Sequence, residues 1–262
     1  MNKKAEELGL TNTHFVTPHG LDAPKHYTTA YELAKLTDYA LNNTTFAKLV
    51  STKTTTVDMG GYPKAISNTN ELLGNLNGVN GVKTGFTNNA LRCLVTSVDR
   101  GDLELITVVL GADTRKIRTK DSTSLIEYSY KNFESVDLDK IAEKEFEKWQ
   151  EKNTDYTYVN KGIKNNVDLQ LCLENNYETG QNTNIVPIKK DEIKDITTEI
   201  IVASYREAPL NNGENNGILL VKLNDDILTE YEITIAENIN RKGIFDYLTQ
   251  MISNYNRILE NY

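Results

Sequence analysis

Residues 79–110, VNGVKTGFTNNALRCLVTSVDRGDLELITVVL, hold the pattern that decides the fold. Three runs rich in apolar and β-branched residues, 79–86, 92–98 and 104–110, follow one another closely along the chain. Asp99-Arg100-Gly101-Asp102 joins the last two runs and is typical of a hairpin turn. Short strands connected in this way pair antiparallel, so the stretch predicts an antiparallel sheet.

Helical patterns surround this predicted sheet. Short helices are expected over 2–8 and 45–50, and a longer one follows an N-cap at Thr28 or Thr29, with Glu32 at capping-box distance from Thr29. The Thr-rich segment 51–59 predicts a further strand, with a turn at 60–63. After the sheet, 119–133 predicts a helix whose apolar stripe consists of Leu125, Ile126, Tyr128 and Phe133.

The composition changes after residue 136. Residues 139–152 are dense in charge and predict a linker helix or a solvated face. Short strand patterns separated by Asn and Gly clusters then suggest a small β-sandwich or barrel, at 168–173, 199–204, 217–223 and 229–236. The last segment, 244–259, has helical period, with one apolar side formed by Ile244, Phe245, Leu248, Met251, Ile252, Tyr255, Ile258 and Leu259.

Length, charge and cysteine content narrow the class of protein. A chain of 262 residues favours two domains, and 29 basic against 37 acidic residues give a net charge of -8, which argues against a nucleic-acid partner. The two cysteines, Cys93 and Cys172, are too few for a disulfide scaffold, and we expect two buried free thiols. The chain opens on a charged helical segment, which is not a signal peptide, and no apolar run is long enough to cross a bilayer.

Lys83-Thr84-Gly85, on the first predicted sheet strand, is the sharpest chemical feature. An edge strand can place an ammonium group, a hydroxyl and free backbone N–H groups along one cleft. Such a set suits a substrate that carries a carboxylate and a peptide carbonyl. Taken alone, the tripeptide fits a solvated strand end better than a binding site.

Three histidines invite a comparison with zinc sites. His14, His19 and His26 are spaced five and seven residues apart across a Pro/Gly-containing loop, and no HExxH-like pattern accompanies them. We therefore predict no metal site and no cofactor.

The residues before and after Lys-Thr-Gly resemble a known protein family over most of the chain. Residues 1–41, 46–54 (FAKLVSTKT), 68–74 (NTNELLG), 78–97 and 105–112 (LITVVLGA) resemble the low-molecular-mass penicillin-binding proteins, the serine D-alanyl-D-alanine carboxypeptidases, in order and spacing. Residues 185–196 (IVPIKKDEIKDI) and 208–223 are similar to the small C-terminal β-domain of that family.

The resemblance implies an α+β fold. Residues 1–136 would form the C-terminal part of a β-lactamase/transpeptidase-like catalytic domain, an antiparallel sheet with helices. Residues 137–243 would form a small all-β, sandwich-like domain, and 244–262 an amphipathic helix. The loop around His19-Gly20-Leu21-Asp22 would be an ordered wall near the active site.

The resemblance also implies a function and its residues. Lys83 would line the catalytic cleft, Thr84 would bind the terminal carboxylate of the substrate, Gly85 would let the substrate approach the strand, and the N–H of Phe86 would be an oxyanion donor. The expected ligands are peptidoglycan stem peptides ending in D-Ala-D-Ala and β-lactam antibiotics. The expected location is the outer face of the bacterial cytoplasmic membrane.

Two alternatives stay open. No serine here begins a Ser-x-x-Lys or a Ser-x-Asn motif, both of which the family needs. We therefore expect the C-terminal portion of a longer enzyme, inactive by itself; the alternative is a non-catalytic module that binds envelope partners or membrane. The terminal helix either lies on the membrane surface or packs against the β-domain.

Overall fold

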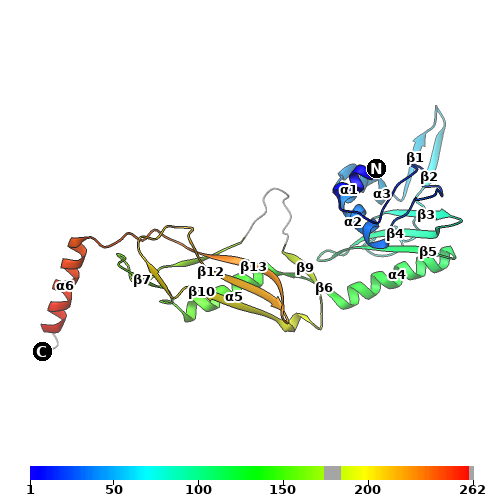
Figure 1. Ribbon diagram of the computed structural model, residues 1–262. Helices are drawn as coiled ribbons and strands as arrows, with labels where there is room; N and C mark the ends of the chain where they lie inside the picture. Colours follow the sequence, from blue (N-terminus) through cyan, green and yellow to red (C-terminus); the bar gives the residue numbers. More distant parts are fainter. Residues whose placement is uncertain (174–183, 260–262) are drawn as a thin grey trace. The chain divides into compact units, whose positions relative to one another are not determined.

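The computed structural model describes residues 1–173 and 184–259, apart from the side chains of 254 and 256–259. The chain divides into two compact units, Met1–Glu134 and Ser135–Tyr262 (Figure 1). Each unit encloses a hydrophobic cluster of its own.

The first unit is built on a three-stranded antiparallel sheet in the order β3 (Lys83–Thr87), β4 (Leu91–Asp99), β5 (Glu104–Ala112). The antiparallel prediction and the turn after Asp99 are thus confirmed. Strand β3 begins later than predicted: Val79 forms only an isolated bridge with Val98 of β4, and regular pairing starts at Lys83, opposite Val95.

Helix α4 (Arg115–Asn132) packs on β4 and β5, and its N-cap is Thr114, whose hydroxyl accepts from the N–H of Ile117 at 3.1 Å. Its buried positions are Arg118, Ser122 and Ile126, spaced four residues apart. The predicted stripe is confirmed only at Ile126, which is buried with Leu94 and Val98. It is wrong elsewhere, because Leu125 and Tyr128 are exposed and Phe133 begins β6 (Phe133–Asp137).

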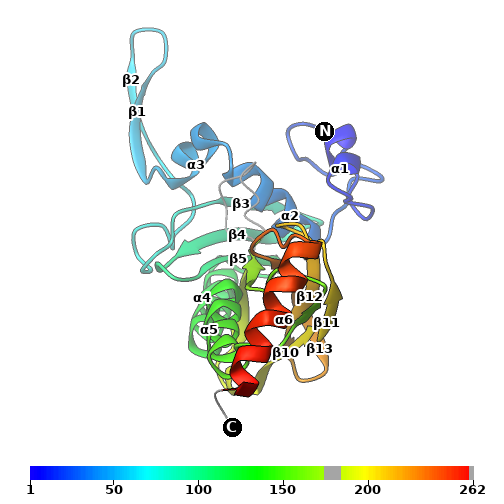
Figure 2. The same ribbon diagram turned by 90° about the vertical axis from the view of Figure 1, so that its left-hand side faces the viewer.

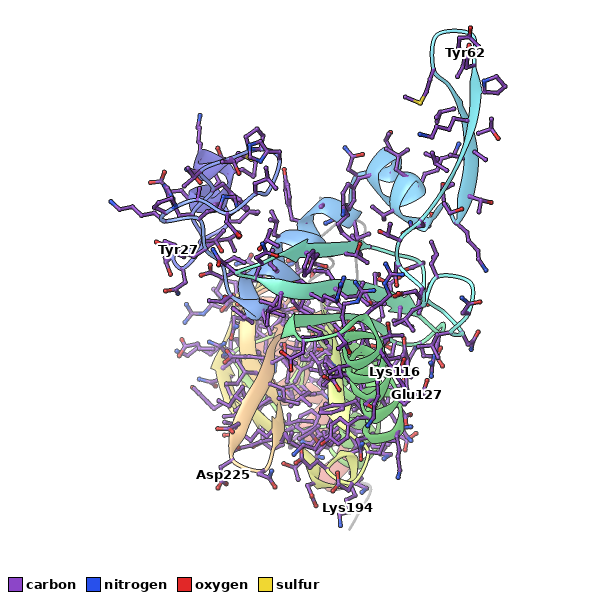
Figure 3. All side chains as sticks on the ribbon, turned by 90° about the vertical axis from the view of Figure 1, so that its right-hand side faces the viewer. Tyr27, Tyr62, Lys116, Glu127, Lys194 and Asp225 are labelled. Carbon is purple, nitrogen blue, oxygen red and sulfur yellow. The ribbon has the colours of Figure 1, made fainter. Side chains whose placement is uncertain are left out.

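The remaining elements of the first unit are α1 (Asn2–Glu7), α2 (Ala30–Leu41), α3 (Thr44–Ser51) and a hairpin of β1 (Thr54–Asp58) and β2 (Pro63–Ser67). The hairpin projects beyond α3 and the sheet (Figure 2). The predicted turn is present, with positive φ at Gly60 and Gly61, and Tyr62 lies at its tip (Figure 3).

Glu32 of α2 anchors the loop that follows α1. The hydroxyl of Thr29 caps α2 by accepting from the N–H of Glu32 at 3.2 Å, as the capping-box pattern predicts. The Glu32 carboxylate, however, does not return to the cap. It accepts from the N–H of Asn12 at 2.8 Å and from the hydroxyl of Thr13 at 2.5 Å. Loop and helix are thereby joined through one buried carboxylate.

This anchor is expected to depend on pH. Burial alone would raise the pKa of Glu32, but hydrogen bonds from Thr13 and Asn12 outweigh it and hold that pKa below its ordinary value. Because the folded-state pKa is the lower one, the stabilisation is complete above the unfolded pKa and is lost as the pH falls through the folded value. NMR should show the amide resonance of Asn12 titrating below pH 4.5, the ordinary value.

In Glu32→Gln that acid titration of the Asn12 amide should vanish, whereas Glu6→Gln, an exposed carboxylate of α1, should leave it intact. An Asn12 amide that titrates identically in all three proteins would show that Glu32 does not hold the loop.

The second unit contains a four-stranded antiparallel sheet in the order β10 (Ile196–Val202), β12 (Asn215–Leu223), β13 (Asp226–Ile235), β8 (Leu169–Cys172). Strand β6 pairs with β9 (Ile185–Lys189), and β7 (Tyr158–Asn160) pairs parallel with β11 (Tyr205–Glu207). A short 3₁₀ turn, η1 (Ile193–Asp195), precedes β10.

Helix α5 (Leu138–Lys152) corrects the interpretation of 139–152 as a linker or a solvated face. Leu138, Ala142 and Phe146 are buried in the cluster of the second unit, and the helix packs against β9, β10 and β12 (Figure 1). The spacing of four residues places these three side chains on one face, so the charged majority of α5 faces water.

Helix α6 (Ile244–Leu259) confirms the predicted terminal helix, and its first turn is closed by Asp246, which accepts from the N–H of Gly243 at 2.7 Å. Its large apolar and aromatic side chains are exposed, from 43% for Tyr247 to 84% for Phe245. The side chains of Ile258 and Leu259, and residues 260–262 of the predicted segment, lie outside the described part. None of the described helices has the length and apolar character needed to span a membrane.

Cys93 and Cys172 are free thiols, as predicted, although both are half-buried rather than buried. They belong to different units.

Candidate functional site

Strand β3 lies at the edge of its sheet, because β4 is its only partner in the described part of the chain. Lys83, Gly85 and Phe86 are exposed and Thr84 is half-buried. The ammonium group of Lys83 donates to the carbonyl oxygen of Thr84 at 2.5 Å and forms no ion pair within the described residues. Its positive charge is therefore available to an external anion.

Thr84, Gly85 and Phe86, the other residues of the predicted site, each have a different local environment on β3. The hydroxyl of Thr84 lies 2.6 Å from that of Thr69. A Cβ at Gly85 would meet only the Cβ of Cys93, at an ordinary 3.7 Å, so packing within the chain does not require glycine there. The ring of Phe86 carries the guanidinium group of Arg92, 4.4 Å from its centre.

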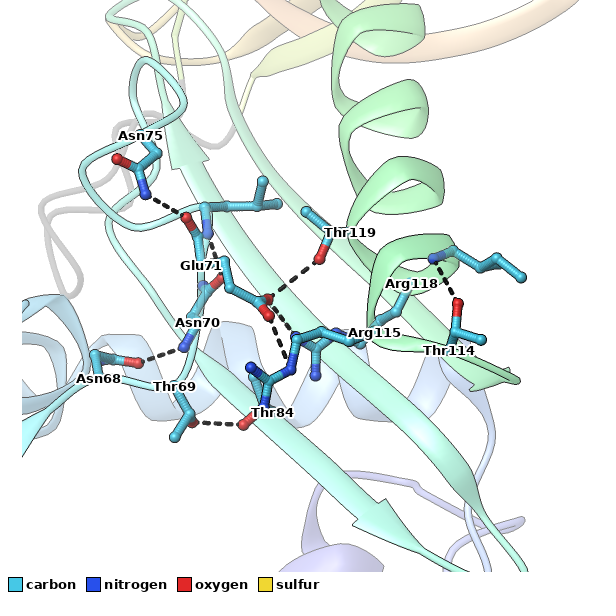
Figure 4. A network of polar contacts seen from close by, with 12 residues as sticks. Asn68, Thr69, Asn70, Glu71, Asn75, Thr84, Thr114, Arg115, Arg118 and Thr119 are labelled. Carbon is cyan, nitrogen blue, oxygen red and sulfur yellow. Dashed lines mark hydrogen bonds and ion pairs between the residues drawn. The ribbon is translucent and has the colours of Figure 1, made fainter.

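Residues 68–71 connect β3 to helix α4 (Figure 4). Thr69 contacts Thr84, and the side-chain amide of Asn70 donates to the carbonyl oxygen of Gly81 at 2.8 Å. Glu71 turns the other way, toward the first turn of α4. The position of the Thr84 hydroxyl therefore depends on a segment that α4 holds by charge.

Glu71 is the centre of that attachment. Its carboxylate forms ion pairs with Arg118 and, at 3.1 Å, with Nε of Arg115, and it accepts from the hydroxyl of Thr119 at 3.2 Å. The Arg118 side chain is only 4% exposed, whereas Glu71 is 33% exposed and Arg115 68% exposed. A buried arginine needs such a counter-charge, since an unpaired buried charge is costly.

A cavity of about 870 Å³ begins just beyond the tetrapeptide. Its lining includes Thr87, the last residue of β3, and Asn89 beyond it, together with Leu21, Asp22 and His26 of the first loop. Lys83, Thr84, Gly85 and Phe86 do not line this cavity. They occupy the open strand edge next to it.

The histidines of that loop serve its main chain. Nδ1 of His14 lies 2.7 Å from the carbonyl oxygen of Lys25, and Nδ1 of His19 accepts from the N–H of Leu21 at 3.1 Å. Nδ1 of His26 accepts from the N–H of Val16 at 3.2 Å. Among residues 1–173 and 184–259 no group of three His, Cys, Asp or Glu side chains is arranged to hold a metal.

Sequence reasoning missed the residues behind β3, namely Thr69, Glu71, Arg115 and Arg118. The segment NTNELLG entered the sequence analysis only through the resemblance, and Arg115 and Arg118 precede the helix predicted over 119–133. Two arginines three residues apart at a helix start, with an isolated glutamate upstream, were the available signal.

Comparison with known proteins shows which proteins this chain resembles. Residues 1–114 match the family model described as D-alanyl-D-alanine carboxypeptidase. The chain is 29% identical over 258 residues, 98% of its length, to the D-alanyl-D-alanine carboxypeptidase DacF of Bacillus subtilis. It is 32% identical over 253 residues to DacC of Escherichia coli. The chain is thus similar, along almost its whole length, to D-alanyl-D-alanine carboxypeptidases.

Solved structures confirm the predicted fold class of this family. Penicillin-binding protein 5 of Haemophilus influenzae matches 92% of the chain with a TM-score of 0.60 and 25% identity, and the match covers 64% of that protein. Penicillin-binding protein 6B of Escherichia coli matches 88% of the chain with a TM-score of 0.59 and covers 57% of that protein. The chain spans 62% of DacF and 56% of DacC, about three fifths of these carboxypeptidases.

Proposed function

We propose that the chain serves a D-alanyl-D-alanine carboxypeptidase of bacterial peptidoglycan metabolism and that β3 binds the D-Ala-D-Ala end of the stem peptide. The observation that carries the proposal is the unpaired edge of β3, where Lys83 is free of ion pairs within the described residues and Thr84 presents a hydroxyl already oriented by Thr69. β-Lactam antibiotics would occupy the same edge.

Each residue of the edge has a distinct role in this proposal. The ammonium group of Lys83 stabilises negative charge in the cleft, and the hydroxyl of Thr84 donates to the terminal carboxylate. Gly85 leaves the strand open to the peptide backbone. The N–H of Phe86 donates to the oxyanion that forms on the scissile carbonyl, a contact typically worth about 3 kcal/mol in the transition state.

The covalent step needs a serine that this sequence does not offer in a Ser-x-x-Lys motif. In acyl transfer by such an enzyme, serine Oγ bonds to the carbonyl carbon, the peptide bond breaks, and the terminal D-alanine leaves after its amine takes a proton. Water then hydrolyses the acyl-serine ester. The contribution of this chain is to bind the substrate and to stabilise the developing charge.

Binding to the chain alone tests this proposal without needing the nucleophile. In an NMR titration with N-acetyl-D-Ala-D-Ala, we expect the amides of β3 to shift and the affinity to be on the order of 1 mM. Thr84→Val removes the hydroxyl at nearly constant volume and should weaken binding about tenfold, the cost of one charge-assisted hydrogen bond.

The matched control is Thr87→Val, four positions from Lys83 on the same strand, which should bind the dipeptide normally. N-acetyl-L-Ala-L-Ala should bind at least several-fold more weakly. Equal binding of the two dipeptides, or equal weakening by both valine substitutions, would count against the proposed site.

We also propose that the protein works outside the cytoplasm, on the outer face of the membrane, with α6 lying on the lipid surface. The observation favouring this is the exposed apolar side of α6, which includes Phe245, Met251 and Ile252. Arg241, Lys242 and Arg257 against Asp246 and Glu260 leave about +1 near the helix, so apolar contact rather than charge would drive adsorption. A non-catalytic module that binds membrane is the second candidate function, and it rests on the same helix.

Vesicle co-sedimentation tests the role of α6. Met251→Glu should lower partitioning about tenfold, because a side chain that would lie in the acyl region becomes charged. Ile227→Glu, at a comparably exposed apolar position of β13, should leave partitioning unchanged. Anionic and zwitterionic vesicles should bind the native chain similarly; binding that requires anionic lipid or survives Met251→Glu would contradict this account.

A further inference from the structure

The second unit contains a small cavity that the function proposed above does not use. Its volume is about 250 Å³, and it lies between the end of α5, the segment before β7 and the start of β8. Pockets for small ligands start at roughly 300 Å³, so this one suits a single ring rather than an extended chain.

Aromatic side chains form one wall of the cavity. Trp149 stacks on Phe146 with ring centres 6.0 Å apart and planes inclined by 11°, and Tyr156 approaches Trp149 edge-on at 5.2 Å. Phe146 is buried, whereas Tyr156 is 42% exposed. A core aromatic therefore holds Trp149 rigidly against the cavity, and Tyr156 adds a second ring at the mouth.

Polar groups with free acceptors also line the cavity. The side-chain amide of Gln150 donates to the carbonyl oxygen of Leu169 at 2.7 Å, and that of Asn153 donates to the carbonyl oxygen of Trp149 at 2.7 Å. Both amide oxygens, and the exposed carboxylate of Asp168, accept no hydrogen bond within the described residues. The cavity thus combines hydrogen-bond acceptors with aromatic rings.

This combination selects a chemical class. No lysine or arginine lines the cavity, and Asp168 carries a negative charge, so phosphates and acidic peptides are disfavoured. A hexose ring presents C–H groups on one face, which can stack on the electron-rich faces of aromatic rings, and hydroxyl donors at its rim, which match amide and carboxylate acceptors.

We propose that this cavity is a saccharide site for one pyranose ring, and that its ligand is an N-acetylglucosamine unit of a glycan strand. The pyranose class follows from the cavity itself. The choice of an N-acetylated sugar rests on the proposed role in peptidoglycan metabolism. In that role the second unit would hold the glycan while β3 binds the peptide.

Trp149 is the only tryptophan in the chain, so its fluorescence reports on the cavity directly. Titrating the full chain with N-acetylglucosamine should give a saturable change in Trp149 emission with a dissociation constant on the order of 1–10 mM. Sorbitol, an open-chain polyol with similar hydroxyls, should give no saturable change. A sugar response that never saturates, or one that sorbitol reproduces, would overturn the proposal.

Two variants and one control locate the binding. Tyr156→Ala and Asp168→Asn should each weaken binding at least fivefold, through loss of a stacking face and of a charged acceptor. Tyr158→Ala removes an equally exposed tyrosine that does not line the cavity, and it should bind normally. Unchanged affinity in both cavity variants, with native circular dichroism, would refute the assignment.

The outcomes for sugar and dipeptide are separable. Sugar is scored at Trp149 in the second unit, and N-acetyl-D-Ala-D-Ala is scored at β3 in the first. Binding of glucose but not of N-acetylglucosamine would refute the N-acetylated ligand, and loss of dipeptide binding alone would refute only the carboxypeptidase role.

Discussion

Glu71→Gln is expected to lower the free energy of unfolding by about 3 kcal/mol. The Arg118 guanidinium group is almost fully buried, and Glu71 is the acid that pairs with it. An amide keeps the shape of the carboxylate but not its charge, so a buried cation is left uncompensated, which costs roughly 3–5 kcal/mol in comparable cases. The lower end applies here because Glu71 is partly exposed to water.

The ion pair between Glu71 and Arg118 leads to a second, contrasting prediction. Arg118→Met removes the buried charge and leaves Glu71 paired with Arg115 and partly hydrated, so it should cost less than Glu71→Gln. In the double variant most of the loss caused by Glu71→Gln should disappear. Guanidinium denaturation followed by circular dichroism measures all three, and Glu104→Gln, an exposed acid outside any ion pair of the described residues, is the control. Additive losses in the double variant would contradict the pairing.

Ile126→Ala should destabilise the first unit by about 3 kcal/mol. The Ile126 side chain is fully buried between α4 and β4, in contact with the cluster that includes Leu94 and Val98. Deleting buried methyl and methylene groups loses their transfer free energy and leaves a cavity, for a total of roughly 2–5 kcal/mol. Ile126 is one of six buried residues in this cluster. We expect few side chains nearby to be able to move into the space that it leaves.

Leu125→Ala is the matched control for this substitution. Leu125 precedes Ile126 in the same helix but is 45% exposed, and its replacement should change stability by less than about 0.5 kcal/mol. The apolar stripe predicted from sequence assigns both residues to the core. Similar losses for the two alanine variants would therefore favour that stripe over the structure.

The sheet of the first unit could be predicted because its signals are local. The apolar, β-branched run from Arg92 to Val98 and the Asp-Arg-Gly-Asp turn each act within a few residues, and both are found where expected. The start of β3 could not be predicted in this way, because pairing with β4 decides it: Val79 forms only an isolated bridge with Val98, and regular pairing starts at Lys83.

Helix burial was harder to predict, because hydrophobicity was taken as the guide to the core. Helix α4 buries Arg118 and Ser122 and exposes Tyr128, since Glu71, from a different segment, supplies the counter-charge. In α5 the three buried residues are outnumbered by charges, and their spacing of four was overlooked. Both errors arise from tertiary partners that composition does not show.

The residues of the site also differ in how far the sequence alone could predict them. Lys83, Thr84, Gly85 and Phe86 are consecutive, so a motif could single them out together. Thr69 and Glu71 join them only through folding, and their link to β3 is visible in contacts rather than in spacing.

A crystal structure of the chain with N-acetyl-D-Ala-D-Ala bound tests the central claim most directly. We predict the dipeptide along the outer edge of β3, with its terminal carboxylate at hydrogen-bond distance, roughly 2.7–3.0 Å, from the hydroxyl of Thr84. The ammonium group of Lys83 should face the peptide. A dipeptide bound instead in the cavity beyond Thr87, or pointing its carboxylate away from Thr84, would contradict the account.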